Sequence, residues 1–125
     1  MTKKALSITL TILFILPVLC LAQEVEVTSV WVKWERRGLD KYSFEAEIQV
    51  GNDTDVTYRV LGNLIFYDRS GYVIKRAMFS GNVEARNGAT LIARGKVPIH
   101  KYKKIASHEA TILSTFPIRR LEGSL

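Results

Sequence analysis

The sequence predicts an all-β protein, an antiparallel β-sandwich of about six or seven strands. Three observations support this prediction. After residue 22, apolar and polar side chains alternate, which is the period of a strand with one buried face. Turn residues interrupt this pattern at short intervals, and no stretch of useful length shows the period of an amphipathic helix.

The alternation is clearest in residues 42–50, where apolar residues at the even positions follow polar residues at the odd ones. Residues 25–34 are rich in β-branched and aromatic side chains, but their apolar phase shifts near Thr28 and Ser29. One extra residue in a strand produces such a shift. We therefore predict a β-bulge there, or a strand that changes sheets.

A hairpin is predicted in the middle of the chain. Residues 56–67 are apolar on both faces, which predicts a strand that is covered on both sides near the centre of the fold. Asp68 to Gly71 form a turn, in which the aspartate accepts backbone hydrogen bonds and the glycine supplies left-handed geometry. Residues 72–79 then form the return strand.

Two further strands are predicted, over residues 89–97 and 109–115. A loop over residues 80–88 precedes the first of them, and residues 101–106 form a connection of at most one helical turn. The domain is expected to span residues 23–118, and residues 119–125 form a polar C-terminal tail.

Residues 1–22 are predicted to be a signal peptide. Lys3 and Lys4 precede an uncharged apolar run over residues 5–22, and Cys20 and Ala22 fit the two small-residue positions before the cut. The predicted location is therefore periplasmic or extracellular. An uncleaved anchor over residues 5–22, with the domain still outside, is the alternative. Lipidation of Cys20 is disfavoured because the bulky Leu19 precedes it.

The cysteine content limits how this domain is stabilised and what chemistry it can do. Cys20 is the only cysteine, and it lies in the predicted leader. The mature chain therefore forms no internal disulfide and offers no thiolate as nucleophile or metal ligand. Its stability has to come from the modest apolar core that a domain of about 100 residues can form.

Positive charge is concentrated between residues 94 and 104, a stretch without any acid. This stretch is the candidate surface for an anionic partner such as lipid, polysaccharide or nucleic acid. The composition favours a simpler interpretation, a solvated edge or loop whose lysines prevent strand-to-strand aggregation. The candidate residues are Arg94, Lys96, Lys101, Lys103 and Lys104.

The two tryptophans, Trp31 and Trp34, fall on opposite faces of a regular strand. One is expected to fill the space between the sheets. Trp31, beside Lys33, is the candidate exposed aromatic that stacks on a sugar ring or a partner's side chain, whereas core packing is the simpler interpretation.

Residues 50–74 carry a pattern of V-x-N, a short polar turn, and an apolar strand that ends in Y-D-x-x-G-x-V. This pattern resembles the FxLYD-type family of small extracytoplasmic immunoglobulin-like domains. Residues 86–93 are similar to the family's P-G-x-T turn, with Asn87 in place of the proline. The resemblance implies an immunoglobulin-like sandwich in the envelope and implies no catalytic residue. The matching positions are Val50, Asn52, Leu64, Phe66, Tyr67, Asp68, Gly71 and Val73.

The sequence contains no motif for catalysis, for a cofactor or for a metal. It lacks a G-x-S-x-G elbow and a glycine-rich phosphate loop. His100 and His108 have no carboxylate at ligand spacing, so we interpret them as surface residues. Asn52, Asp53 and Asp55 supply oxygen atoms in a tight turn, for which turn capping is favoured over cation binding.

These observations predict an exported, non-enzymatic binding or interaction module of the cell envelope. Its partner is expected to be another envelope protein or an anionic polymer, held by strand addition or by the basic stretch, with no specific nucleic acid. Membrane contact is expected only through an uncleaved leader. The alternatives are a carbohydrate-binding accessory or small hydrolase, and a structural subunit of an envelope assembly. The sequence does not predict an oligomeric state.

Overall fold

The computed structural model describes residues 24–119, which form six strands and one short helix. The predicted signal peptide at residues 1–22 and the predicted tail beyond Arg119 lie outside the described residues. Within the described range, no helix is long and apolar enough to cross a membrane. The elements are β1 (Val25–Arg37), β2 (Lys41–Asn52), β3 (Tyr58–Asp68), β4 (Val73–Val83), β5 (Gly88–Pro98), α2 (Ile99–Tyr102) and β6 (Ile105–Pro117).

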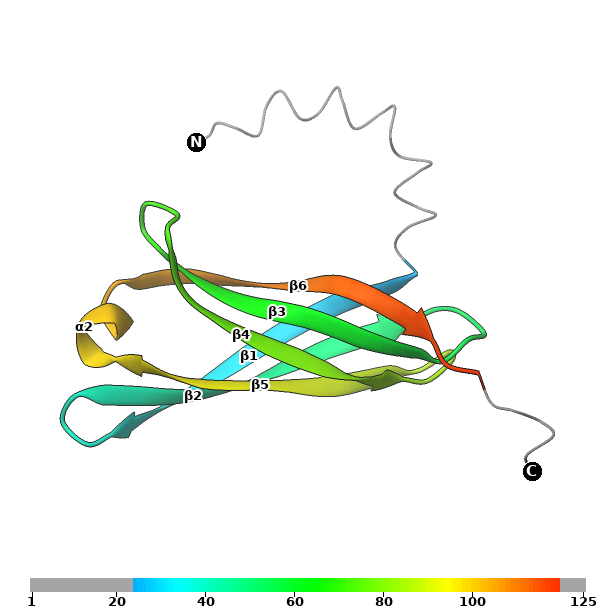
Figure 1. The fold of residues 1–125 in the computed structure, drawn as a ribbon, viewed down its shortest axis with the longest axis horizontal. Helices are drawn as coiled ribbons and strands as arrows, with labels where there is room; N and C mark the ends of the chain where they lie inside the picture. The colour runs from blue at the N-terminus through cyan, green and yellow to red at the C-terminus, as the bar shows by residue number, and fades with distance from the viewer. Residues whose placement is uncertain (1–23, 120–125) are drawn as a thin grey trace, which may run out of the picture.

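The described strands form two antiparallel sheets of three strands each (Figure 1). One sheet has the order β1-β2-β5 and the other the order β4-β3-β6. Their apolar faces enclose a single core, which is the arrangement of a β-sandwich. The predicted all-β class with two antiparallel layers is confirmed, and the number of strands described is six.

The core belongs to four of the six strands. Every fully buried apolar side chain in the described range lies on β2, β3, β4 or β5, whereas β1 and β6 contribute half-buried side chains only. Burial of one valine, leucine, isoleucine or phenylalanine side chain contributes about 1.5–3 kcal/mol. The buried set is Phe44, Ala46, Ile48, Val50, Val60, Leu64, Phe66, Ala77, Phe79, Val83, Leu91, Ala93 and Val97.

The predicted bulge in β1 is confirmed. The pairing of β1 with β2 shifts by one residue between Val27 and Ser29, and β1 stays in the same sheet along its whole length. Because a strand alternates its faces, the extra residue brings side chains from both sides of the shift onto the core side. Val25 and Val27 before the shift, and Val30, Val32 and Trp34 after it, all pack against the core.

The prediction that the strand after residue 56 is covered on both faces is wrong for one face. As expected, β3 is the central strand of its sheet, and its inward residues Val60, Leu64 and Phe66 are fully buried. Its outward residues Leu61 and Ile65 are half-buried. In a fold of two layers the outer face has no third layer above it, so side chains of neighbouring strands give it only partial cover.

Three predicted boundaries are corrected. β4 continues to Val83, so the expected loop over residues 80–88 shrinks to residues 84–87. The helical turn begins earlier, at Ile99, and the last strand begins at Ile105 rather than at residue 109. Gly81 falls in the predicted loop, where glycine is a turn signal, but it lies within β4. A Cβ atom at this position would meet Leu91 Cδ2 of β5 at 2.5 Å. Glycine permits this close approach of the two strands.

Candidate functional site

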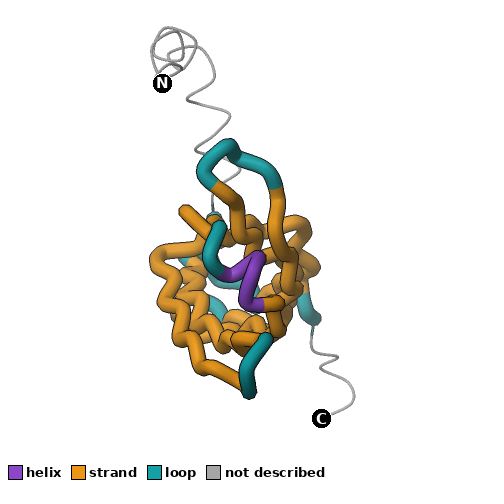
Figure 2. The backbone as a smooth tube through the Cα atoms, turned by 90° about the vertical axis from the view of Figure 1, so that its left-hand side faces the viewer, coloured by secondary structure: helices purple, strands orange, loops and turns teal. Residues whose placement is uncertain are grey.

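Three connections of the chain meet at one end of the sandwich. They are the β1–β2 turn at residues 38–40, the β3–β4 turn at residues 69–72, and the segment 99–104 that contains α2. This end lies on the left of Figure 1, and Figure 2 looks directly at it, with α2 between the two turns. We call it the basic end, because it carries seven exposed cations, Arg36, Arg37, Lys41, Arg69, Lys101, Lys103 and Lys104.

The predicted basic stretch is divided between two places. Lys101, Lys103 and Lys104 lie on the basic end. Arg94 and Lys96 instead point outward from β5 on the face of its sheet, and Arg94 Nε lies 3.3 Å from Glu45 Oε1 of the neighbouring strand β2. The structure therefore brings three of the five predicted residues to one surface.

The other four cations of the basic end were missed by the sequence analysis, since they belong to two other hairpins. Arg36, Arg37 and Lys41 flank the β1–β2 turn, and Arg69 lies in the β3–β4 turn. A usable signal existed in the chain. In an antiparallel chain, successive connections fall at alternate ends, so every second turn shares an end.

An aromatic cluster fixes α2 to the sandwich. The Tyr102 ring stacks on Tyr42, with centroids 3.9 Å apart and planes at 13°, and meets Trp34 edge-on at 4.9 Å. The Ile99 N–H also donates to the Asp40 carbonyl at 2.8 Å, which joins α2 to the β1–β2 turn. The three lysines around α2 are thus mounted on a packed support rather than on a free loop.

A hollow of about 400 Å³ separates the β3–β4 turn from the start of β6, and Arg69, Lys103 and Lys104 line it. Asp68 also lines it, and its Oδ1 accepts the N–H groups of Ser70 and Tyr72, each at 2.9 Å, so the three cations outnumber one carboxylate. Within residues 24–119, Arg37 is the only one of the seven cations in a salt bridge, with Glu35. The hollow is therefore suited to an anion with several oxygen atoms.

The opposite end is more acidic and is tied together by one buried amide. Asn52 is 4% exposed, and its Nδ2 donates to the carbonyls of Val56, Val83 and Glu84 at 2.8–3.2 Å. Its Oδ1 accepts from the backbone N–H and the hydroxyl of Thr54, at 3.0 and 2.7 Å. One side chain thus links the β2–β3 and β4–β5 connections, as the turn-capping interpretation expects.

Ion pairs add to this link at the surface of the acidic end. Arg86, which has a φ of 61°, places Nε 2.9 Å from Asp55 Oδ1 and Nη1 3.3 Å from Asp53 Oδ1. The hydrogen bond and the charge of Arg86 lower the pKa of the Asp55 carboxyl below its ordinary value. The part of the chain that the structure describes contains no group of three or more side chains suited to holding a metal ion.

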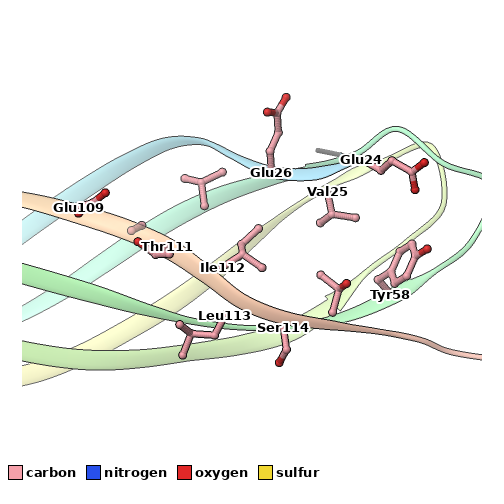
Figure 3. Close-up of a pocket in the computed structure, with 12 residues that line it drawn as sticks. Glu24, Val25, Glu26, Tyr58, Glu109, Thr111, Ile112, Leu113 and Ser114 are labelled. Atoms are coloured by element: carbon pink, nitrogen blue, oxygen red, sulfur yellow. The ribbon is translucent and has the colours of Figure 1, made fainter. Parts of the chain in front are cut away.

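An open seam separates the edge strands β1 and β6. Among the described pairings, β1 pairs only with β2 and β6 only with β3. A groove of about 600 Å³ lies between them (Figure 3). Its lining includes the half-buried apolar residues Val25, Val27 and Ile112, together with three exposed acids, Glu24, Glu26 and Glu109. This seam offers unpaired backbone groups beside apolar surface and negative charge.

Trp31 and Trp34 differ in exposure. Trp31 is 60% exposed on the outer face of β1, and Lys33 Nζ lies 5.6 Å from its ring centroid. Trp34 is half-buried and packs on Phe44 and Phe66, with centroids 5.3 and 5.2 Å apart. The side chain of Trp31 is thus accessible, and that of Trp34 belongs to the interior.

The sequence matches no protein-family model and no curated protein. The fold is similar to the crystal structure of a DUF1425 family member from Shewanella sp. pv-4, at 12% identity over 72% of this chain and 77% of that chain, with a TM-score of 0.48. It is also similar to the X-ray structure of Northeast Structural Genomics Consortium target SoR45, at 12% identity over 76% of this chain and 85% of that chain, with a TM-score of 0.46. Both similarities are distant, so the two-layer architecture is established by the strand pairing of this chain itself.

Proposed function

We propose that this protein is an exported, non-enzymatic interaction module of the cell envelope that binds an anionic partner through its basic end. The observation that carries the proposal is the convergence of seven exposed cations from three separate connections. As part of this proposal, residues 1–22 act as a signal peptide, and the sandwich is an immunoglobulin-like domain of the FxLYD type. Its location is periplasmic or extracellular.

The placement of the three lysines around α2 favours binding over a role in preventing aggregation. Lysines that block strand-to-strand association are needed along exposed sheet edges, such as β1 and β6 here. Lys101, Lys103 and Lys104 instead lie in a connection, on a support that the stacking of Tyr102 on Tyr42 holds in place. A fixed group of like charges raises the local concentration of an anionic partner and speeds its association.

The test replaces Lys101, Lys103 and Lys104 together by glutamate and measures binding to heparin, a soluble polyanion, at low salt. Each cation near an anionic surface is worth about 1 kcal/mol, so we expect the affinity to fall by about a hundredfold or more. The matched control reverses Arg59, Arg76 and Arg119, three exposed cations outside the basic end, and has the same net charge. This control is expected to retain most of the affinity.

Two results contradict the proposal. Unchanged heparin binding in the lysine variant would exclude the basic end as the binding surface. An equal loss in the lysine variant and in the matched control would show that total charge, rather than this surface, drives the binding.

A second candidate function is favoured by the open seam. An extended segment of a partner can add as a strand to the free edge of β1 or β6, with its apolar side chains on Val25 and Ile112. The acids along the groove favour basic side chains at the alternate positions of that segment.

The probe for this seam is a short synthetic peptide that alternates valine and lysine. We expect it to shift the NMR signals of the amides at residues 25–27 and 110–115, and expect Glu109→Lys to weaken its binding. The matched control is the same peptide with alternate backbone nitrogens methylated, which removes the hydrogen bonds of a strand. Equal binding of both peptides would exclude strand addition.

A further inference from the structure

The two most exposed large apolar side chains of the described range both lie on the basic end. Leu39 is 87% exposed in the β1–β2 turn, and Tyr72 is 74% exposed at the end of the β3–β4 turn. A soluble polyanion requires cations alone and gains nothing from these apolar tips. Their position beside the cations therefore indicates a partner that has an apolar phase as well as negative charge.

Both tips are held in defined turns. Arg36 donates from Nε to the Gly38 carbonyl at 3.0 Å and from Nη2 to the Leu39 carbonyl at 3.3 Å. In the other turn, the Asp68 carboxylate accepts the Tyr72 N–H at 2.9 Å, and Gly71 adopts a φ of 90°. Because the backbones are fixed, the two side chains are presented to a partner with little additional loss of entropy.

The cations lie beside the tips. The hollow lined by Arg69, Lys103 and Lys104 is next to the turn that carries Tyr72, and the Ile99–Asp40 hydrogen bond joins α2 to the turn that carries Leu39. Figure 2 shows α2 between the two hairpin turns. Phosphate oxygens of lipid headgroups can occupy the hollow while the two tips reach past the headgroups toward the acyl chains.

The two ends of the domain differ in charge, and this difference orients the domain on a negatively charged surface. The seven cations of the basic end lie among three acids, Glu35, Asp40 and Asp68. The opposite end has the acids Glu24, Glu26, Asp53, Asp55 and Glu84 and the cations Arg59, Arg86 and Arg119. Strands of 11–13 residues make the sandwich roughly 40 Å long, several times the Debye length of about 8 Å at physiological salt. A negatively charged surface therefore attracts the basic end and leaves the acidic end outside its field.

We infer that the partner of the basic end is an anionic lipid surface, on which the domain stands with Leu39 and Tyr72 inserted into the interfacial layer. Leucine supplies apolar burial, and the tyrosine ring and hydroxyl suit the boundary between acyl chains and headgroups. This inference rests on the proposed function, since it names the partner of the same surface. It departs from the sequence-based expectation that only an uncleaved leader would contact a membrane.

The test compares sedimentation of the purified protein with vesicles of phosphatidylcholine alone and with vesicles that also contain phosphatidylglycerol. We expect binding only to the anionic vesicles. Leu39→Ser and Tyr72→Ser are each expected to weaken it about tenfold, because each removes the burial of one large apolar side chain. Both variants are expected to bind heparin as the parent does. The matched control, Met78→Ser, removes an apolar side chain that is 57% exposed on β4 and is expected to change neither measurement.

The outcomes separate this inference from the proposed function. Heparin binding without vesicle binding overturns the membrane contact and leaves the anionic-partner proposal standing. If the parent protein binds neither heparin nor anionic vesicles, the anionic-partner proposal and the membrane contact are both overturned. Vesicle binding that is unaffected by the two tip variants, or that survives reversal of Lys101, Lys103 and Lys104, overturns the insertion at this end.

Discussion

The two ends of this sandwich handle polar groups in opposite ways. At the acidic end, Asn52 satisfies three carbonyls from two connections, and Arg86 neutralises two aspartates. At the basic end, seven cations share one described salt bridge, between Arg37 and Glu35. The acidic end thus pairs its polar groups inside the molecule, whereas six of the seven cations of the basic end form no salt bridge within residues 24–119.

This difference separates an end whose polar groups are paired inside the molecule from the end that we propose binds a partner. Buried polar groups that are fully paired hold connections together and have little left to offer a partner. Exposed cations that form no salt bridge add little to stability and carry electrostatic attraction outward. The comparison predicts that substitutions at the acidic end reduce stability, whereas substitutions at the basic end reduce binding.

The largest effect on stability is expected for Asn52→Ala. The change leaves three carbonyls of the acidic end without their amide donor. The hydrogen bond to Val83 is buried and the other two are part-buried, and a buried unsatisfied group costs about 1–3 kcal/mol. We expect the free energy of unfolding to fall by about 2 kcal/mol. Urea unfolding followed by circular dichroism measures it, with Asn82→Ala, an exposed asparagine of β4, as the control.

Substitutions at the basic end are expected to affect stability much less than Asn52→Ala does. Reversal of Lys101, Lys103 and Lys104 to glutamate is expected to change the free energy of unfolding by less than about 0.5 kcal/mol, as is usual for exposed sites. A loss at the basic end as large as the loss from Asn52→Ala would remove the distinction between the two ends.

The smallest effect is a pH dependence at the acidic end. Because Arg86 lowers the pKa of Asp55 in the folded protein, the ionised carboxylate stabilises the fold. This contribution is fully present above the unfolded pKa of about 4 and is lost as the pH falls through the lower, folded value. Compared with the parent, Asp55→Asn should therefore lose stability at neutral pH and lose little at pH values below that range. A difference that is constant with pH would exclude the Arg86 pair as its cause.

The strands were predictable because their signal is local. The alternation in residues 42–50 predicted a half-buried strand, and the phase shift near Thr28 predicted a bulge or a change of sheet. The structure has the strand and the bulge. Gly81 was misread as part of a loop because its role is a close approach to Leu91, a residue on another strand. That approach is invisible in the sequence around residue 81.

The candidate site was only partly predictable for the same reason. Lys101, Lys103 and Lys104 are close in sequence and form a visible basic run, whereas Arg36 and Arg69 are separated from them by whole strands. Leu39 and Tyr72 showed no pattern, since a single apolar residue in a polar turn has no period. Their joint exposure became evident only when the turns met at one end.

The sequence by itself determined the all-β class, the approximate positions of the strands, the irregularity near Thr28 and the absence of cysteine after residue 22, because all of these depend on neighbouring residues or on composition. Tertiary structure alone decided how closely the turns at one end approach each other, which of the cations in residues 24–119 form no salt bridge, and where the two sheets leave an open seam. These features depend on which residues become neighbours in space. Charges interact over several ångströms, and the pairing of antiparallel strands brings together residues that are far apart along the chain.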